Sequence, residues 1–511
     1  MISRCLLVRA GRMGLVLVAV GLLSPLPGRA DPHYVNSFAA LRNAMLTADP
    51  YDEIIIAPGS YHVTSPLYVT TPNLTFRGAT GNRDDVVLYG NGMNVNSGVL
   101  EGFWAAADGI RLESVTIRDF WHHGIHICGD GYADNVVISN VKTVNCGERH
   151  VKGSASSGIS SNVLIENLRM EQTIPYLPRP GHSVDEYNYI GGIDAMHTDN
   201  WIIRDCVAKG IMGAAGGARA AFFLWNGVSN LLMERNTIVA CGHGISIGNP
   251  SGPNNSHVNP WHAVGGIIRN NTILRADESD DNWAFELDNT KDFKVYNNTI
   301  YSADTTYRRT VQIYDDPSEG LTTNLDLKNN LIRGRVKDLS SGDWSSAAVA
   351  AMGNIVDTDG TVVLPEWFAD WAGGDFHLTA ASTAGAVTPV NIAAVLADVL
   401  EDYDQALRGN SPDLGADEII LIAGDATLDW QVELADLSAL ALHFDTPAGM
   451  RWNHGDFDGD SAVTLADLSI LAFNWGVGTA APVPEPATLV LLATGALAIR
   501  RRRAKCFSKR R

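Results

Sequence analysis

Seven short segments share a β-rich pattern, and the residues between their apolar positions could do acid–base chemistry. The segments are 124–128, 150–154, 192–196, 221–225, 244–248, 284–288 and 310–314. If they stack about 4.8 Å apart with alternate residues facing outward, one outer column reads His126, Lys152, Asp194, Phe223, Ser246, Glu286 and Gln312. Flanking positions add His150, Trp225, Asp288 and Tyr314. A slip of one residue in any segment would reverse its assignment.

Imidazoles, an amine, carboxylates and aromatic rings on one face favour a groove for carbohydrate. In this alignment Asp194 and Glu286 are three segments apart, or roughly 14 Å. Glycoside hydrolysis needs two carboxyl groups about 5–9.5 Å apart, so this pair does not fit it. Eliminative cleavage of a uronic-acid polymer needs a base for the C5 proton and cations for the sugar carboxylate. The column supplies both.

We predict four catalytic residues: His126, His150, Lys152 and Asp194. Because Asp194 would hold the Lys152 amine protonated, a histidine is the better base and Lys152 the better partner for the sugar carboxylate. We expect five further residues to bind substrate: Arg149, His197, Trp225, Glu286 and Tyr314. Charged columns on such surfaces can also serve only to keep a sheet soluble. Non-catalytic glycan binding or a surface or matrix structural role is therefore the main alternative, and a glycoside hydrolase is another.

A recurrent turn residue indicates how these segments are positioned. Its positions, 27 to 38 residues apart, are Asn140, Asn167, Asp205, Arg235, Asn270, Asn297 and Asn329. A repeated period with variable insertions is typical of a solenoid, and short strands without long helices between them favour a β-solenoid. Asn tolerates left-handed backbone geometry, and stacked Asn side chains can hydrogen-bond from one repeat to the next.

Residues 31–345, which hold this repeat, resemble the right-handed parallel β-helix proteins of the pectate-lyase-like superfamily. The resemblance implies an all-β fold and action on a polysaccharide, without fixing one activity. The repeat fades over 346–420. The motifs 402–404, 408–409 and 412–416 in that segment resemble the terminal cap and anchor modules that often follow such helices in exported bacterial proteins.

An acidic segment, 421–478, contains a duplication whose copies lie 31 residues apart. Calcium binds six to eight oxygen atoms, and a loop with acidic residues at alternate positions supplies them from one chain. The second copy offers Asp456, Asp458, Asp460, Thr464 and Asp467. The first offers Asp425, Asp429, Glu433 and Asp436, but it has Thr427 and Trp430 where a liganding residue and a glycine are usual, so its site is expected to be weaker.

Each of these loops leads into an apolar run that fits one short helix. The pair resembles a type I dockerin, which implies a small α-helical, EF-hand-like module with calcium as its cofactor and a cohesin-like protein as its partner. The alternative is an acidic helical hairpin that uses calcium only to fold.

The two ends of the chain carry export signals. Residues 1–30 have arginines, an apolar run and then small residues, the order of a secretory signal peptide. Residues 479–511 have Val-Pro-Glu-Pro, the apolar stretch 487–499 and a basic tail, which resembles the PEP-CTERM sorting signal. That resemblance implies recognition by an exosortase-type enzyme, transient membrane association through the tail, and delivery to the cell surface or extracellular matrix. An ordinary basic-flanked anchor is the alternative.

The composition excludes some functions and leaves the cysteines open. The chain has 57 acidic and 38 basic residues, and its basic residues are concentrated at the two ends. A body this acidic is not expected to bind nucleic acid, because binding to phosphate needs clustered Lys and Arg. Four cysteines lie in the body, at 128, 146, 206 and 241, without the spacing of a zinc site. They could form disulfides or be buried as small apolar residues.

Overall fold

In this computed structural model the described residues are 31–129, 133–154, 158–181, 185–249, 252–276, 282–383, 387–419, 421–429 and 431–477. The predicted signal peptide and the C-terminal sorting tail lie outside the described residues. None of the helices in the described part of the chain has the length and apolarity needed to span a bilayer.

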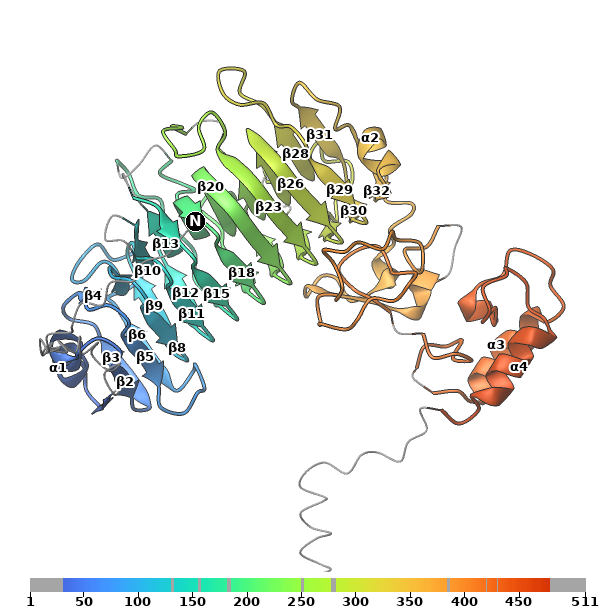
Figure 1. The fold of residues 1–511 in the computed structure, drawn as a ribbon, viewed down its shortest axis with the longest axis horizontal. Coiled ribbons are helices and arrows are strands. Elements are labelled where there is room, and N and C mark those ends of the chain that lie inside the picture. Colours follow the sequence, from blue (N-terminus) through green and yellow to red (C-terminus); the bar gives the residue numbers. More distant parts are fainter. Residues whose placement is uncertain are drawn as a thin grey trace, which may run out of the picture.

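The described chain is mostly β, and most of its strands belong to two parallel sheets (Figure 1). The larger sheet has 21 strands: β1 (Pro32–Val35), β2 (Glu53–Ile56), β4 (Leu67–Val69), β5 (Thr75–Gly78), β7 (Phe103–Ala105), β8 (Arg111–Glu113), β10 (His123–Cys128), β11 (Val137–Ser139), β13 (Arg149–Ser154), β14 (Ser160–Ser161), β15 (Leu164–Glu166), β17 (Gly191–Asp199), β18 (Ile202–Arg204), β20 (Phe222–Glu234), β22 (Ile245–Ile247), β23 (Ala263–Arg269), β25 (Phe285–Asp288), β26 (Thr290–Tyr296), β28 (Val311–Tyr314), β29 (Asp326–Lys328) and β31 (Val336–Leu339).

The second sheet has 11 strands: β3 (Gly59–His62), β6 (Val86–Tyr89), β9 (Thr116–Phe120), β12 (Lys142–Cys146), β16 (Arg169–Glu171), β19 (Val207–Lys209), β21 (Thr237–Cys241), β24 (Thr272–Arg275), β27 (Thr299–Tyr301), β30 (Leu331–Arg333) and β32 (Ile355–Asp357). A separate antiparallel pair is formed by β33 (Phe368–Asp370) and β34 (Asp375–Leu378).

The chain winds in stacked coils, and each coil adds strands to both sheets. For example, β10 pairs with β13 of the next coil, β11 with β15, and β12 with β16. Figure 1 shows this stack running from β2 at the blue end to β31 at the yellow end. Residues some 30 positions apart in the sequence therefore become neighbours on the outer wall.

The interior of the coils is apolar, as the alternating pattern predicts. The predicted inward positions are all at most 1% exposed: Ile125, Ile127, Val151, Ile193, Phe222, Leu224, Ile245, Ile247, Phe285, Leu287, Val311 and Ile313. Burial of one such side chain contributes about 1.5–3 kcal/mol relative to leaving it in water. This repeated burial fixes which face of each strand points outward.

The recurrent turn residues adopt the predicted left-handed backbone. All seven have φ between 51° and 58°. Some of them also bond between coils, because Asn167 Nδ2 donates to Asn140 Oδ1 at 3.2 Å and Asn329 Nδ2 donates to Asn297 Oδ1 at 3.2 Å.

A second asparagine ladder runs inside the coils and was not predicted. Its five members are Asn236, Asn271, Asn298, Asn330 and Asn354, and each of the first four Nδ2 groups donates to the next Oδ1 at 2.9 Å. Four of them directly follow a recurrent turn residue. The ladder supplies hydrogen-bond partners to backbone groups that turn inward at this corner, which would otherwise be buried without partners.

The two ends of the coil are covered differently. At the first coil, α1 (Phe38–Thr47) is capped by Ser37 and buries Leu41, Ala44 and Met45. Near the other end lie α2 (Ser346–Ala351) and the short 3-10 helices η2 (Pro365–Trp367) and η3 (Ala380–Thr383).

The segment that follows η3 docks on the turns of the last coils. Asn270 Nδ2 donates to the carbonyl of Glu401 at 2.7 Å, and Asn329 Nδ2 donates to that of Ala394 at 2.7 Å. The buried guanidinium of Arg408 donates to Glu418 Oε2 at 2.9 Å and to Asn270 Oδ1 at 3.2 Å. These contacts anchor the segment to the outer turn residues.

The acidic duplication forms two short helices, α3 (Leu434–His443) and α4 (Leu465–Phe473), with η4 (Trp452–His454) between them. Both α-helices begin with a capping box, in which Asp436 and Asp467 bond back to the residue that precedes the helix. A small apolar core joins them, formed by Ala426, Val432, Leu440, Phe457, Val463 and Leu471.

Cys128, Cys146, Cys206 and Cys241 are all buried. The cysteines could have formed disulfides or been buried as small apolar residues, and the structure favours burial.

Candidate functional site

The strand register places the predicted outer column in one line. His126 pairs with Lys152 and Lys152 pairs with Asp194. The line continues through Phe223, Ser246, Glu286 and Gln312 in the predicted order. Trp104 precedes His126 and Lys337 follows Gln312. The alignment therefore did not slip in any of these seven strands.

At the centre of the column, Asp194 binds two cations. Lys152 Nζ donates to Asp194 Oδ1 at 2.9 Å, and Arg149 Nε donates to Oδ2 at 2.5 Å. Trp225 Nε1 donates to the same Oδ1 at 3.2 Å. Asp194 is only 2% exposed, whereas the Lys152 side chain is 15% exposed. Lys152 is thus the most exposed of the three charged residues in this group.

Burial and the neighbouring charges shift the pKa values of both Asp194 and Lys152. Burial would raise the pKa of Asp194, but the charges of Lys152 and Arg149 hold it well below its usual range. Burial lowers the pKa of the Lys152 amine below its ordinary value; the Asp194 charge opposes this shift and the Arg149 charge adds to it. The Asp194 charge therefore favours the protonated amine, and burial opposes it.

His150 is not part of the outer wall, which corrects its predicted placement beside the column. Its side chain is fully buried, and Nδ1 lies 2.8 Å from the hydroxyl of Thr143 on β12. Burial lowers the pKa of His150 to about 3. Because His150 follows the corner at which β13 begins, strict alternation does not yet hold there, and its ring packs inside the coil. It cannot contact a substrate.

The predicted substrate-binding residues fall in different places. Arg149 and Trp225 both contact Asp194, but Arg149 is 3% exposed and acts by holding that carboxylate. Glu286 and Tyr314 line a pocket further along the column. His197 is away from both groups; it is 6% exposed, and its ring lies 6.5 Å from that of His257.

The pocket at Glu286 and Tyr314 has a volume of about 700 Å³, and Arg219, Trp283 and Arg309 also line it. Arg309 Nη1 donates to Gln312 Oε1 at 2.7 Å, and Gln312 Nε2 donates to Glu286 Oε1 at 2.6 Å. Burial raises the pKa of Glu286 to about 7. The pocket thus combines two guanidinium groups with a carboxyl group that is about half protonated near pH 7.

Arg219 connects this pocket to the Asp194 group. The guanidinium carbons of Arg149 and Arg219 lie 4.5 Å and 5.3 Å from the centre of the Tyr189 ring. A Cβ atom added to Gly191 would lie 3.4 Å from Arg149 and 3.5 Å from Arg219, so both side chains pass over this glycine. Arg219 and Arg309 were not predicted, because they lie between strands, where the alternating pattern carries no information.

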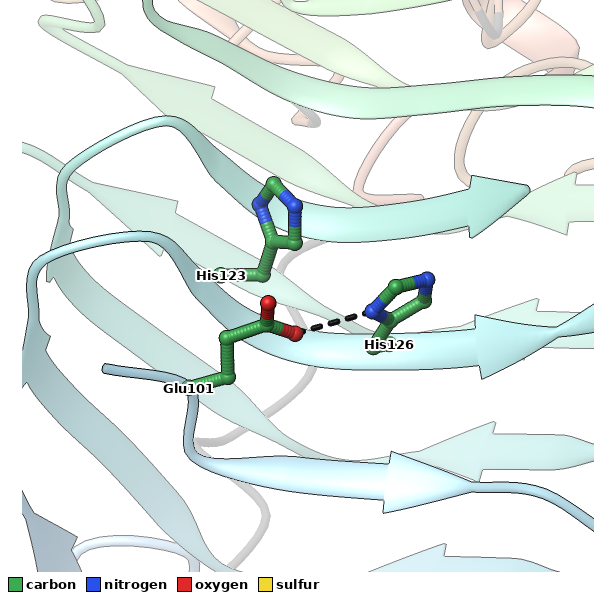
Figure 2. Close-up of side chains that lie close together, drawn as sticks. All are labelled: Glu101, His123 and His126. Atoms are coloured by element: carbon green, nitrogen blue, oxygen red, sulfur yellow. Dashed lines mark hydrogen bonds and ion pairs between the residues drawn. The ribbon is translucent and has the colours of Figure 1, made fainter. Parts of the chain in front are cut away.

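Two further polar residues surround His126 and were also missed. Its Nδ1 lies 2.8 Å from Oε2 of Glu101, in the segment before β7, and His123 lies beside both on β10 (Figure 2). The ring of His126 lies 4.3 Å from that of Trp104. The sequence does contain one local indication of this group, because three histidines occur within five residues at 122–126.

The second acidic loop gathers carboxylates as a calcium loop requires. Asp456, Asp458 and Asp460 each offer an oxygen within 4.8 Å of the others. Asp467 accepts from the backbone N–H groups of Phe457 and Thr464 at 2.7 and 2.8 Å. In the first loop, no comparable group forms among the residues that the structure describes there, which exclude residue 430.

The chain matches one family description and is similar in shape to several solved structures. Residues 482–504 match the PEP-CTERM protein-sorting motif. This motif indicates an exported, cell-surface-targeted protein and implies recognition by an exosortase. A sequence comparison with curated proteins finds no match.

Three solved structures illustrate what the chain is similar to in shape. The pectate lyase Pel9A is 16% identical, with a TM-score of 0.48, over 76% of this chain and 96% of that one. An alginate lyase from Paenibacillus sp. str. FPU-7 is 14% identical, with a TM-score of 0.37, over 58% and 99%. The catalytic domain of a GH87 alpha-1,3-glucanase in complex with nigerose is 13% identical, with a TM-score of 0.38, over 60% and 55%.

Proposed function

We propose that the coiled body is a right-handed parallel β-helix that cleaves an acidic, uronate-containing polysaccharide by elimination, with Lys152 as the base. The observation that carries this proposal is the environment of the Lys152 amine. It lies on the outer wall, it is 2.9 Å from Asp194, and burial lowers its pKa. A lowered pKa favours the unprotonated amine that a general base needs, and Asp194 then stabilises the ammonium that forms.

In the proposed reaction the Lys152 nitrogen takes the proton from C5 of a uronate unit. The electron pair of the C5–H bond forms the C4–C5 double bond, the C4–O4 bond breaks, and the leaving oxygen takes a proton from water. The sugar carboxylate must be held by a cation, because negative charge develops next to it. Arg219 suits this role, since it is half-buried beside the Asp194 group and also lines the 700 Å³ pocket.

The test is the ultraviolet absorbance of the unsaturated uronate product, measured with pectin, alginate and other uronans. The wild-type chain should produce it with at least one of them, and Lys152→Gln should lose at least about two orders of magnitude in rate, which is the usual contribution of a general base. Lys294→Gln is the matched control, because Lys294 pairs with Asp398 at 2.6 Å on an exposed part of the wall. If no uronan produces absorbance, the lyase proposal fails and a non-catalytic glycan-binding or structural role becomes the better interpretation.

Glycoside hydrolysis is a second candidate, favoured by one observation. Glu286 lines the pocket with a pKa of about 7, which suits a general acid. Release of reducing ends without ultraviolet absorbance, lost in Glu286→Gln and retained in Lys152→Gln, would support hydrolysis instead.

We also propose that residues 421–477 form a dockerin-like module whose second loop binds calcium through Asp456, Asp458 and Asp460. The oxygen group of that loop and the two matching capping boxes support this assignment. A cohesin-like protein is the proposed partner. Delivery to the extracellular matrix is the corresponding proposal for the exported chain.

A further inference from the structure

We propose that Glu101, His123 and His126 form a binding site for a divalent transition metal of the zinc class. This site is separate from the acidic calcium loop, and the proposal does not depend on the lyase assignment.

The three side chains already have the spacing that a metal ion needs. Each offers one ligand atom, and these atoms lie within 4.8 Å of one another. Figure 2 shows Glu101 extending toward the ring of His126, with His123 beside them. A bound ion would replace the 2.8 Å contact between Glu101 Oε2 and His126 Nδ1 by two bonds to the metal.

The environment of His123 is a second observation that points to a ligand. Its Nδ1 atom is buried without a hydrogen-bond partner among the described residues. A buried ring nitrogen in this state loses hydrogen-bonding free energy unless something binds it. Its other ring nitrogen, Nε2, lies 3.8 Å from Oε2 of Glu148. A histidine that binds metal through one nitrogen and faces a carboxylate with the other is a common arrangement in metal sites.

The donor set selects the class of metal. Two imidazoles and one carboxylate suit zinc and similar transition metals, whereas calcium prefers oxygen ligands alone. Glu101 also lines a pocket of about 550 Å³, together with Trp104 and His122. A metal held there would be accessible from that pocket. It would also lie one coil from Lys152, because His126 and Lys152 are paired in register.

The experiment measures metal binding by the full-length chain, without a histidine tag and without substrate. Excess calcium is present to occupy the oxygen-only loops. Zinc is titrated calorimetrically into the wild type and into Glu101→Gln and His126→Gln. We expect each variant to weaken the site at least about tenfold, or to lose one equivalent of zinc. His33→Gln should bind as the wild type does, because His33 pairs with Asp52 at 2.9 Å outside this group.

A second cluster, His377 with Asp404 and Asp417, could also take up zinc. X-ray absorption of the zinc-loaded wild type separates the two, because the proposed site supplies two imidazoles and the other cluster only one. This X-ray measurement is made on the wild type, so it does not depend on whether a variant folds. Two imidazoles per zinc, lost on mutation of Glu101 or His126, support the proposal. Unchanged binding in both variants, a single imidazole, or binding that is lost only in His377→Gln would overturn it.

Discussion

The Lys152 amine and the Asp194 carboxylate lie 2.9 Å apart, although 42 positions separate them in the sequence. The pairing of β13 with β17 brings them together, and Arg149 binds the second oxygen of the same carboxylate. Asp194 is therefore the shared partner of the Arg149 guanidinium and the Lys152 amine. Removing it would leave both without a carboxylate partner in a poorly hydrated part of the wall, although Arg149 would keep its bond to the carbonyl of Glu148 at 2.8 Å.

We predict that Asp194→Asn lowers the free energy of unfolding by about 3–5 kcal/mol, the usual cost of breaking a buried ion pair. Asp398→Asn is the matched control: it removes the partner of Lys294 from an exposed pair, with a side chain 38% exposed, and should cost at most about 1 kcal/mol. Chemical unfolding followed by circular dichroism measures both. Equal losses in the two variants would show that the Asp194 group is not buried as described.

Glu286 makes stability depend on pH in a defined direction. Its pKa is about 7 in the folded protein, because burial disfavours the charged form, against an ordinary value of 4.5. Between these two values the unfolded chain has lost the proton that the folded chain keeps, so stability falls as pH rises from about 4.5 to 7. The expected loss is about 3 kcal/mol.

Glu286→Gln should remove this dependence. Relative to the wild type, the variant should gain about 3 kcal/mol of stability between pH 4 and pH 8, because glutamine has no proton to lose. Unfolding by denaturant at several pH values in both proteins provides the measurement. Parallel stability curves would place the pKa of Glu286 near its ordinary value.

The buried asparagine ladder should contribute much more to the free energy of unfolding than an exposed asparagine does. Asn298 Nδ2 donates to Asn330 Oδ1 at 2.9 Å, and its own Oδ1 accepts from Asn271 Nδ2 at 2.9 Å. Asn298→Ala removes the acceptor of the buried Asn271 N–H, at 3.0 Å, and the donor to the carbonyl of Ile268, at 2.9 Å, with a cost of roughly 1–3 kcal/mol for each group. We predict a total loss of about 3 kcal/mol or more.

Asn91→Ala is the control for that change. Asn91 is exposed and donates to the carbonyl of Ser97 at 3.0 Å, so its removal should change stability by no more than about 0.5 kcal/mol. Denaturant midpoints of the two variants and the wild type measure the loss of stability in each variant. A loss in Asn298→Ala as small as that of the control would mean that water replaces the ladder at little cost.

The outer column could be predicted from the sequence because two signals agree. The period of two along each strand assigns the faces, and the recurrent turn residues, such as Asn140 and Asn167, mark where each coil restarts. Together they gave the register from His126 to Gln312, which the strand pairing confirms. The acidic group of the second loop was also visible, because Asp456, Asp458 and Asp460 are close in sequence.

The remaining parts of the site have no such period. Glu101, Arg219 and Arg309 lie outside the strands, and their positions depend on how the loops pack. His150 was misplaced because alternation begins only after the corner that precedes Val151. The inner ladder was missed because Asn271, directly after a turn residue, cannot be told from a second turn residue by its type alone.

The acidic duplication gives the last prediction. Calcium bound to Asp456, Asp458 and Asp460 would screen three carboxylates whose oxygens lie within 4.8 Å of one another. A ligand present at 1,000 times its dissociation constant stabilises the folded form by about 4 kcal/mol. Chelation should therefore speed hydrogen exchange in α3 and α4 and leave the strands of the coil unchanged. Hydrogen-exchange mass spectrometry of the full chain, with and without chelator, resolves the two regions.

Asp458→Ala should exchange rapidly in both conditions, whereas Asp445→Asn, outside the oxygen group, should respond to chelator as the wild type does. Exchange of α3 and α4 that ignores chelator in the wild type would refute calcium binding by this loop.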